Sequence, residues 1–106
     1  GKSKVRPAAK GKAAAVLQAD KFALYGEEAD KLRTLQLGSY EQRQNALQDW
    51  DMLSERFPEL KKFNPGLERS RVGGVLHYRL VVNSPKGGFR DLCNKMRSQQ
   101  VECLIK

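Results

Sequence analysis

The chain has 106 residues, which is enough for one hydrophobic core and too few for two. Lys and Arg total 20 against 12 Asp and Glu, so the formal net charge is +8 and a negatively charged partner has to be considered. No run approaches the roughly 18 apolar residues of a membrane span, and the basic opening does not continue into the apolar segment of a signal peptide. We expect any membrane anchor to lie outside this sequence.

The first 30 residues differ in composition from the rest. Residues 1–12 are basic, carry no acidic side chain and have almost no apolar surface, which predicts a disordered linker. Within residues 13–30, the run Ala13–Tyr25 favours helix and Gly26 would be its C-terminal cap. We interpret this region as a linker or a marginal helix packed loosely on the domain. The folded domain is expected over residues 31–106.

The first regular element is an amphipathic strand. Leu35 and Leu37 point to one face, and Thr34 and Gln36 point to the other, which is the period of a half-buried strand. Gly38 is expected to end this strand.

A helix is expected directly behind it. Ser39 and Gln42 have the spacing of a capping box. Apolar positions then recur at steps of four, three and four along the chain, at Ala46, Trp50, Leu53 and Phe57. Pro58 should end the helix, and Leu60 and Phe63 should form one further docked turn.

The second half of the chain begins with a hairpin. Leu67–Val72 and Val75–Val82 are predicted strands, joined by Gly73 and Gly74, which both tolerate the positive φ of a two-residue loop. In the second strand one face is apolar and the other carries Val75, His77, Arg79 and Val81.

A second helix and a last strand complete the pattern. Ser84 and Pro85 are placed to start the helix, whose apolar stripe is Phe89, Leu92, Cys93 and Met96. The last strand is expected from alternating apolar positions at Val101, Cys103 and Ile105. The order strand, helix, strand, strand, helix, strand predicts an α+β, ferredoxin-like βαββαβ fold. It is a four-stranded antiparallel sheet with two helices on one face and the other face open.

The chain lacks the residue patterns of catalysis and metal binding. It contains one histidine and no zinc-ligand spacing, no phosphate-binding loop, and no base beside Ser39 in the sequence. We therefore expect no enzymatic activity, no metal and no cofactor. Cys93 and Cys103 both face inward in the predicted fold, where they form either a disulfide or a pair of ordinary buried thiols.

Several motifs in order resemble a known family. LQLGSY, a helix bearing Trp50, HYRLVV and LCNKMRSQQVECLI are similar to the SPOR (sporulation-related repeat) domain of bacterial cell-envelope proteins. The resemblance covers residues 32–105 and implies the same βαββαβ fold. It also implies a periplasmic or extracytoplasmic, non-enzymatic domain that binds peptidoglycan glycan strands lacking stem peptides, often at division septa. We expect the domain to be a monomer. Since that compartment is oxidising, we expect a disulfide between Cys93 and Cys103.

The resemblance also suggests site residues on the open sheet face. Gln36 and Ser39 match the family's Q-x-G-S positions, and Arg79 matches the Arg of its Y-R-V strand. His77 precedes Tyr-Arg, and Thr34 lies on the same face. The sequence departs from the family at residues 83–88, which form a shorter turn, and at position 100, where Gln replaces the usual Gly.

Two other functions remain open from the residues alone. RNA-recognition modules share this topology, but they stack bases on aromatic side chains of the open face, where this chain has Thr34, Gln36, His77 and Arg79. We therefore expect no specific nucleic-acid partner. A protein–protein adaptor could use the sheet face or the segment Ala13–Tyr25. We rank glycan binding first, the adaptor second and RNA binding third.

Overall fold

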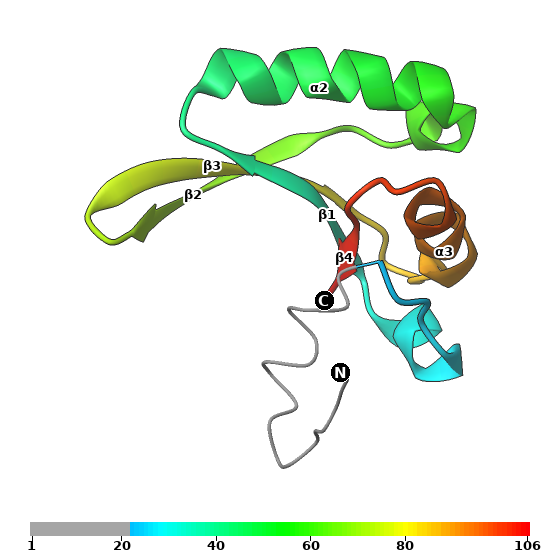
Figure 1. Cartoon of the computed structure of the whole chain (residues 1–106). Helices are drawn as coiled ribbons and strands as arrows, with labels where there is room; N and C mark the ends of the chain where they lie inside the picture. The colour runs from blue at the N-terminus through cyan, green and yellow to red at the C-terminus, as the bar shows by residue number, and fades with distance from the viewer. Residues whose placement is uncertain (1–21) are drawn as a thin grey trace, which may run out of the picture.

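The computed structural model of the chain describes residues 22–106 and contains one four-stranded antiparallel sheet. The strands lie in the order β2-β3-β1-β4, with α2 and α3 packed on the sheet (Figure 1). This arrangement confirms the predicted α+β, split βαβ class. The elements in chain order are η1 (Glu27–Lys31), β1 (Thr34–Tyr40), α2 (Arg43–Arg56), η2 (Pro58–Lys62), β2 (Gly66–Val72), β3 (Val75–Asn83), α3 (Arg90–Ser98) and β4 (Leu104–Ile105).

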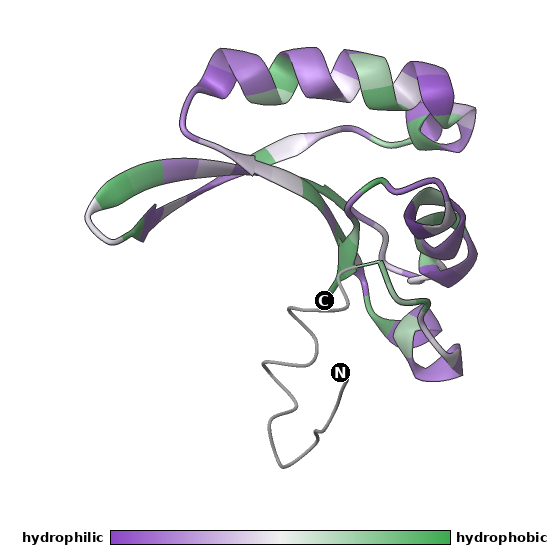
Figure 2. Cartoon of the chain, in the orientation of Figure 1, coloured by the Kyte–Doolittle hydropathy of each residue, from purple (hydrophilic) through white to green (hydrophobic). Residues whose placement is uncertain are grey.

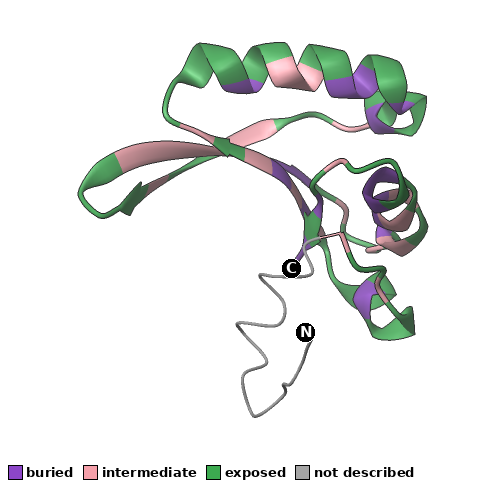
Figure 3. Cartoon of the chain, viewed as in Figure 1, coloured by how far each residue is buried: buried purple, intermediate pink, exposed green. Residues whose placement is uncertain are grey.

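One apolar core joins both helices to the sheet. The predicted helical stripes are buried, except that Trp50 and Leu92 are only partly buried. Figures 2 and 3 show that α2 is more apolar and more buried on its sheet side than on the other. Pro58 starts η2, which docks Leu60 into the core as expected. The largest fully buried side chains are Phe57, Phe89, Leu35, Leu60, Leu80, Met96 and Val82, together with the two cysteines. Both helices therefore cover the same face of the sheet.

The end of β1 differs from the prediction. Gly38 does not end the strand, because pairing with β3 continues to Tyr40, which lies opposite Tyr78. Between Gln36 and Gly38 the register shifts, so that the strand carries a β-bulge there. A bulge inserts one residue without breaking the ladder, and the residues that follow change face. Non-local pairing has therefore overridden a local breaker signal.

The capping box predicted from Ser39 and Gln42 is also wrong. Ser39 lies inside β1 opposite Arg79, and Gln42 is itself the N-cap residue of α2, without a side-chain cap bond. The extension of β1 to Tyr40 uses the residue that the capping box needed.

The second helix begins later than predicted, at Arg90 and not at Ser84. The intervening loop is held by distant backbone, since the N–H of Gly88 donates to the carbonyl of Asp30 at 2.9 Å. Gly87 has φ 68°, and a Cβ there would collide with the backbone of Asp30 and Leu32. The loop therefore packs tightly against η1, and this contact delays the helix.

The structure differs from the prediction at both ends of the described chain. Residues 1–21 lie outside the described residues, as do the predicted linker and most of the predicted helix Ala13–Tyr25. Phe22–Gly26 is not helical, and Gly26 precedes η1 with φ −88°, so it does not cap a helix that ends at Tyr25. At the other end, β4 spans only Leu104–Ile105, shorter than expected. None of the helices in residues 22–106 is both long and apolar enough to span a membrane.

The turn after α3 holds Gln100 in a left-handed backbone conformation. Gln100 has φ 64°, and the N–H of Val101 donates to the carbonyl of Met96 at 2.9 Å, which is the Schellman arrangement of a helix end. Glycine adopts this left-handed conformation without the Cβ penalty.

Gln100→Gly is expected to raise the free energy of unfolding by about 1 kcal/mol, because it relieves that penalty. Urea denaturation would measure the change. The matched control is Gln99→Gly, one residue earlier at φ −100°, which should lower stability through backbone entropy. A Gln100→Gly protein no more stable than wild type would contradict this explanation.

Candidate functional site

The sheet face opposite the helices gathers all the predicted site residues. Ser39 lies opposite Arg79, and the polar residues alternate along both strands with buried core residues. The two tyrosines of the central strands, Tyr40 and Tyr78, pair with each other on the helix side. The residues brought to this open face are Thr34, Gln36 and Ser39 from β1 and His77 and Arg79 from β3.

A polar bridge crosses the middle of the open face. The ammonium of Lys106, just beyond β4, donates to Gln36 Oε1 at 3.0 Å and lies 3.5 Å from Glu68 Oε1 on β2. The bridge thus spans from one edge of the sheet to the other and passes over β3. There, Val81 points to the open face and is nevertheless only 2% exposed. The amide oxygen of Gln36 is therefore held by a cation in this structure.

The other site residues are less constrained. The Oγ atom of Ser39 lies 3.4 Å from Nδ1 of His77, and the hydroxyl of Thr34 donates to Oδ1 of Asn83 at 2.8 Å. Arg79 is half-buried between neighbouring strands, and its side chain makes no hydrogen bond or ion pair with any residue in 22–106. Its guanidinium is therefore a cation whose five donors are not used by this part of the chain.

The end of β1 that follows the bulge is hydrogen-bonded to α2 on the helix side of the sheet. The hydroxyl of Tyr40 donates to the carboxylate of Asp49. Burial, followed by this hydrogen bond and the charge of Asp49, raises the pKa of Tyr40 well above its ordinary value. The phenol therefore stays protonated and remains a donor at neutral pH. This contact holds the end of β1 against α2. The preceding residue, Ser39, lies on the opposite face of the sheet.

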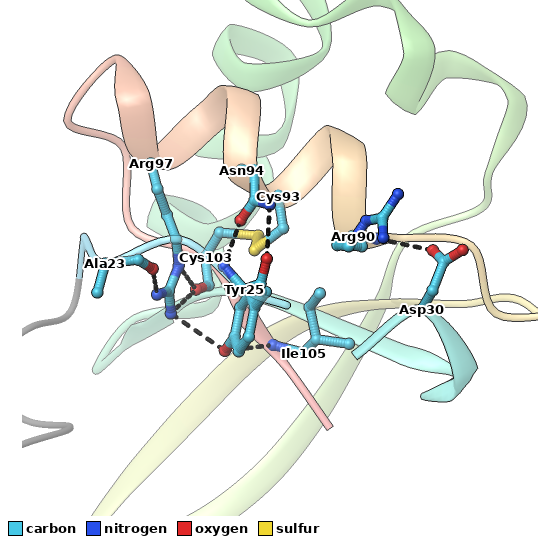
Figure 4. Close-up of a disulfide and its surroundings, with 9 residues drawn as sticks. All are labelled: Ala23, Tyr25, Asp30, Arg90, Cys93, Asn94, Arg97, Cys103 and Ile105. Atoms are coloured by element: carbon cyan, nitrogen blue, oxygen red, sulfur yellow. Dashed lines mark hydrogen bonds between the residues drawn. A yellow bond between two sulfur atoms is a disulfide. The ribbon is translucent and has the colours of Figure 1, made fainter. Parts of the chain in front are cut away.

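The short strand β4 is held in place by the predicted disulfide. Cys93 of α3 and Cys103 are bonded, with their Cα atoms 5.7 Å apart, and Figure 4 shows the bond beside the start of β4. The described part of the chain contains no free cysteine. By fixing the start of β4, the disulfide also places Lys106 next to β1.

A buried arginine, Arg97, also holds the start of β4. Arg97, 8% exposed, donates to the carbonyl oxygen of Cys103 at 2.8 and 2.6 Å and to the carbonyl of Ala23. Its guanidinium lies 4.2 Å from the ring centroid of Tyr25, whose hydroxyl accepts from the N–H of Ile105 at 3.1 Å (Figure 4). Arg97 therefore joins the first described residues to β4.

Sequence reasoning missed four residues that shape the site. They are Tyr25, Glu68, Arg97 and Lys106. Lys106 follows the alternation of the last strand, which would have placed it on the open face. Arg97 follows directly after the apolar stripe of α3, and its burial has no local signal because its partners are distant backbone carbonyls.

The arrangement of side chains on the open face is suited to hydrogen bonding. Within residues 22–106, no group of three His, Cys, Asp or Glu side chains could hold a metal ion. The open face offers guanidinium, ammonium, amide, hydroxyl and imidazole groups on a rigid sheet. No protein-family model, curated protein or solved structure matches the chain.

Proposed function

We propose that the open sheet face binds peptidoglycan glycan strands, and that the domain thereby targets a bacterial cell-envelope or division protein. The observation that carries the proposal is the guanidinium of Arg79, which has no partner among residues 22–106 and stands between the strands that bear Ser39 and Glu68. Sugar hydroxyls and acetamido groups need donors and acceptors at fixed spacing, and a sheet supplies such a platform.

A saccharide suits this face better than a nucleic acid does. Nucleic-acid-binding sheets of this topology stack bases on aromatic rings of the two central strands. Here Tyr40 and Tyr78 lie on the helix side, and the open face of these two strands carries the imidazole of His77 as its only ring. Charge alone would give only salt-dependent, sequence-independent binding.

The two cations of the face favour glycan strands without stem peptides. Removal of the peptide from a muramic acid leaves its lactyl carboxylate free, and a guanidinium recognises a carboxylate through two parallel hydrogen bonds. The side chain of Arg79, which has no partner among residues 22–106, is available for this contact. Lys106 can add a second charge if a ligand oxygen replaces Gln36 as its acceptor.

The disulfide supports an extracytoplasmic location for this activity. Disulfides persist in oxidising compartments such as the periplasm and are rare in the cytosol. The Cys93–Cys103 bond holds β4, which places Lys106 on the binding face. The periplasm is therefore the compartment that we propose for the domain.

Arg79→Ala is expected to weaken binding to amidase-treated sacculi by about 10- to 150-fold, because it removes a charged hydrogen-bonding partner worth about 1.5–3 kcal/mol. Gln36→Ala should weaken binding by about 2- to 10-fold, because a neutral hydrogen bond is worth about 0.5–1.5 kcal/mol. A co-sedimentation assay would measure bound protein. Arg69→Ala is the matched control, since Arg69 lies opposite Tyr78 on the helix side. If both open-face variants sediment as wild type does, the site is wrong.

A further inference from the structure

The outer edge of β2 is an unpaired sheet edge with a regular pattern. Val72 and Val75 flank the two-residue hairpin loop, so they form a hydrogen-bonded pair. Because hydrogen-bonded and non-hydrogen-bonded pairs alternate, Leu67, Arg69 and Arg71 direct their backbone N–H and C=O groups away from β3. In residues 22–106 no backbone group pairs with this edge.

The same three residues point their side chains to the helix side of the sheet. Arg69 lies opposite Tyr78, and Leu67 lies opposite the buried Leu80. At this place a groove of about 450 Å³ opens between α2 and the hairpin. Its lining combines apolar and cationic side chains: Arg43, Leu47, Pro65, Leu67, Arg69 and Tyr78. A strand added to this edge would point alternate side chains into the groove.

The cations at this edge lack counter-charges within the described chain. The side chains of Arg43 and Arg69 take part in no ion pair or hydrogen bond there, and the guanidinium of Arg71 donates only to the carbonyl of Gly74 at 3.3 Å. A row of like charges on an edge strand repels a second copy of the same strand. It attracts a segment of opposite charge.

We propose that β2 binds an extended acidic peptide, which adds as a fifth, antiparallel strand. Main-chain hydrogen bonds to Leu67, Arg69 and Arg71 would supply affinity, and alternate side chains would supply specificity. The peptide residues opposite Arg71 and Arg69 are acidic, and the residue opposite Leu67 is apolar and contacts the groove. The phosphates of a nucleic acid could pair with the arginines, but they would contact neither the apolar lining of the groove nor the outward N–H groups of β2. The partner is therefore an acidic segment of a protein, bound at a site separate from the open face.

The test uses a labelled heptapeptide, TETETFT, whose second, fourth and sixth residues would face Arg71, Arg69 and Leu67 in antiparallel pairing. NMR titration of the protein with this peptide should shift the amide signals of those three residues. Their hydrogen exchange should slow, and the amides of Glu68 and Ser70, which already bond to β3, should exchange at unchanged rates. Uniform changes along β2, or none, would overturn the proposal.

Two modified peptides separate backbone pairing from charge. TKTKTFT, with the acidic residues replaced by lysine, should bind at least about tenfold more weakly than TETETFT. A TETETFT peptide N-methylated at its second, fourth and sixth residues should lose binding to a similar degree, because those amides would pair with β2. Equal binding of either modified peptide would contradict strand addition.

Two charge-reversal variants, Arg69→Glu and Arg79→Glu, test which face of the sheet takes part in peptide binding. Arg69→Glu should lower affinity for TETETFT at least about tenfold and raise affinity for TKTKTFT, because the charge opposite the peptide reverses. Arg79→Glu makes the same change on the opposite face and should leave peptide binding intact. Arg69-dependent binding of single-stranded RNA without peptide binding would assign the edge to nucleic acid. A dimer that protects the same amides would assign it to a second copy.

Discussion

Arg97→Met is expected to lower the free energy of unfolding by about 3 kcal/mol, because hydrogen bonds to a buried charged group contribute about 1.5–3 kcal/mol and Arg97 makes several of them. The carbonyl of Cys103 would lose its donor while it remains buried, and Tyr25 would lose the cation above its ring. Arg97→Lys should recover only part of the loss, since a single ammonium cannot replace a planar fork of donors. Urea denaturation would give the free energies of unfolding of the wild-type, Arg97→Met and Arg97→Lys proteins.

The control for this prediction lies on the same helix. Lys95 pairs with Glu59 at 2.8 Å on the surface, and Lys95→Met should leave the unfolding midpoint nearly unchanged. Arg97→Met should also increase proteolysis between Phe22 and Gly26, because the contacts of Ala23 and Tyr25 with the domain depend on Arg97. An Arg97→Met protein as stable as the Lys95→Met protein would contradict the anchoring role of this residue.

Reduction of the Cys93–Cys103 disulfide is expected to lower the free energy of unfolding by about 2.5–3 kcal/mol, which is the chain-entropy estimate for a loop of this length. The two residues are ten positions apart, and both thiols would stay buried in the core after reduction. The comparison of oxidised and reduced protein therefore leaves packing unchanged, unlike a substitution. Denaturation with and without a reductant would give the difference.

Thiol counting on the unreduced, denatured protein provides the control. It should find no free thiol, because both cysteines of the chain are bonded. Two free thiols would contradict the disulfide and remove the support that it gives to an oxidising compartment. Reduction should also loosen β4 and with it the contact between Lys106 and Gln36.

The fold could be predicted because burial on one face imposes a period on the sequence. The alternation in β3 and the stripes of α2 and α3 reflect that requirement, and the structure places them as expected. The prediction was wrong where a distant contact outweighed a local signal. β1 runs past Gly38 because β3 continues to pair with it, and α3 starts late because Gly88 bonds to Asp30.

In the candidate site, too, local patterns could be predicted from the sequence and distant contacts could not. Alternation was enough to assign Gln36 and Arg79 to the open face, because facing depends only on local geometry. The contacts of Lys106 with Gln36 and Glu68 were not predicted, since they depend on the reach of one long side chain across neighbouring strands. The alternation of a strand decides which face a side chain is on, and it does not specify such lateral partners.

The most direct test of the proposed function is an NMR titration of the domain with solubilised glycan strands from amidase-treated peptidoglycan. We expect signals of Gln36, Ser39, His77 and Arg79 to shift together, while those of Leu67 and Arg69 at the β2 edge do not. Strands that keep their stem peptides should bind about tenfold more weakly or worse, because their lactyl carboxylates are no longer free to bond to Arg79. Equal affinity for the two glycan preparations, or shifts confined to the helix side of the sheet, would contradict binding at the open face.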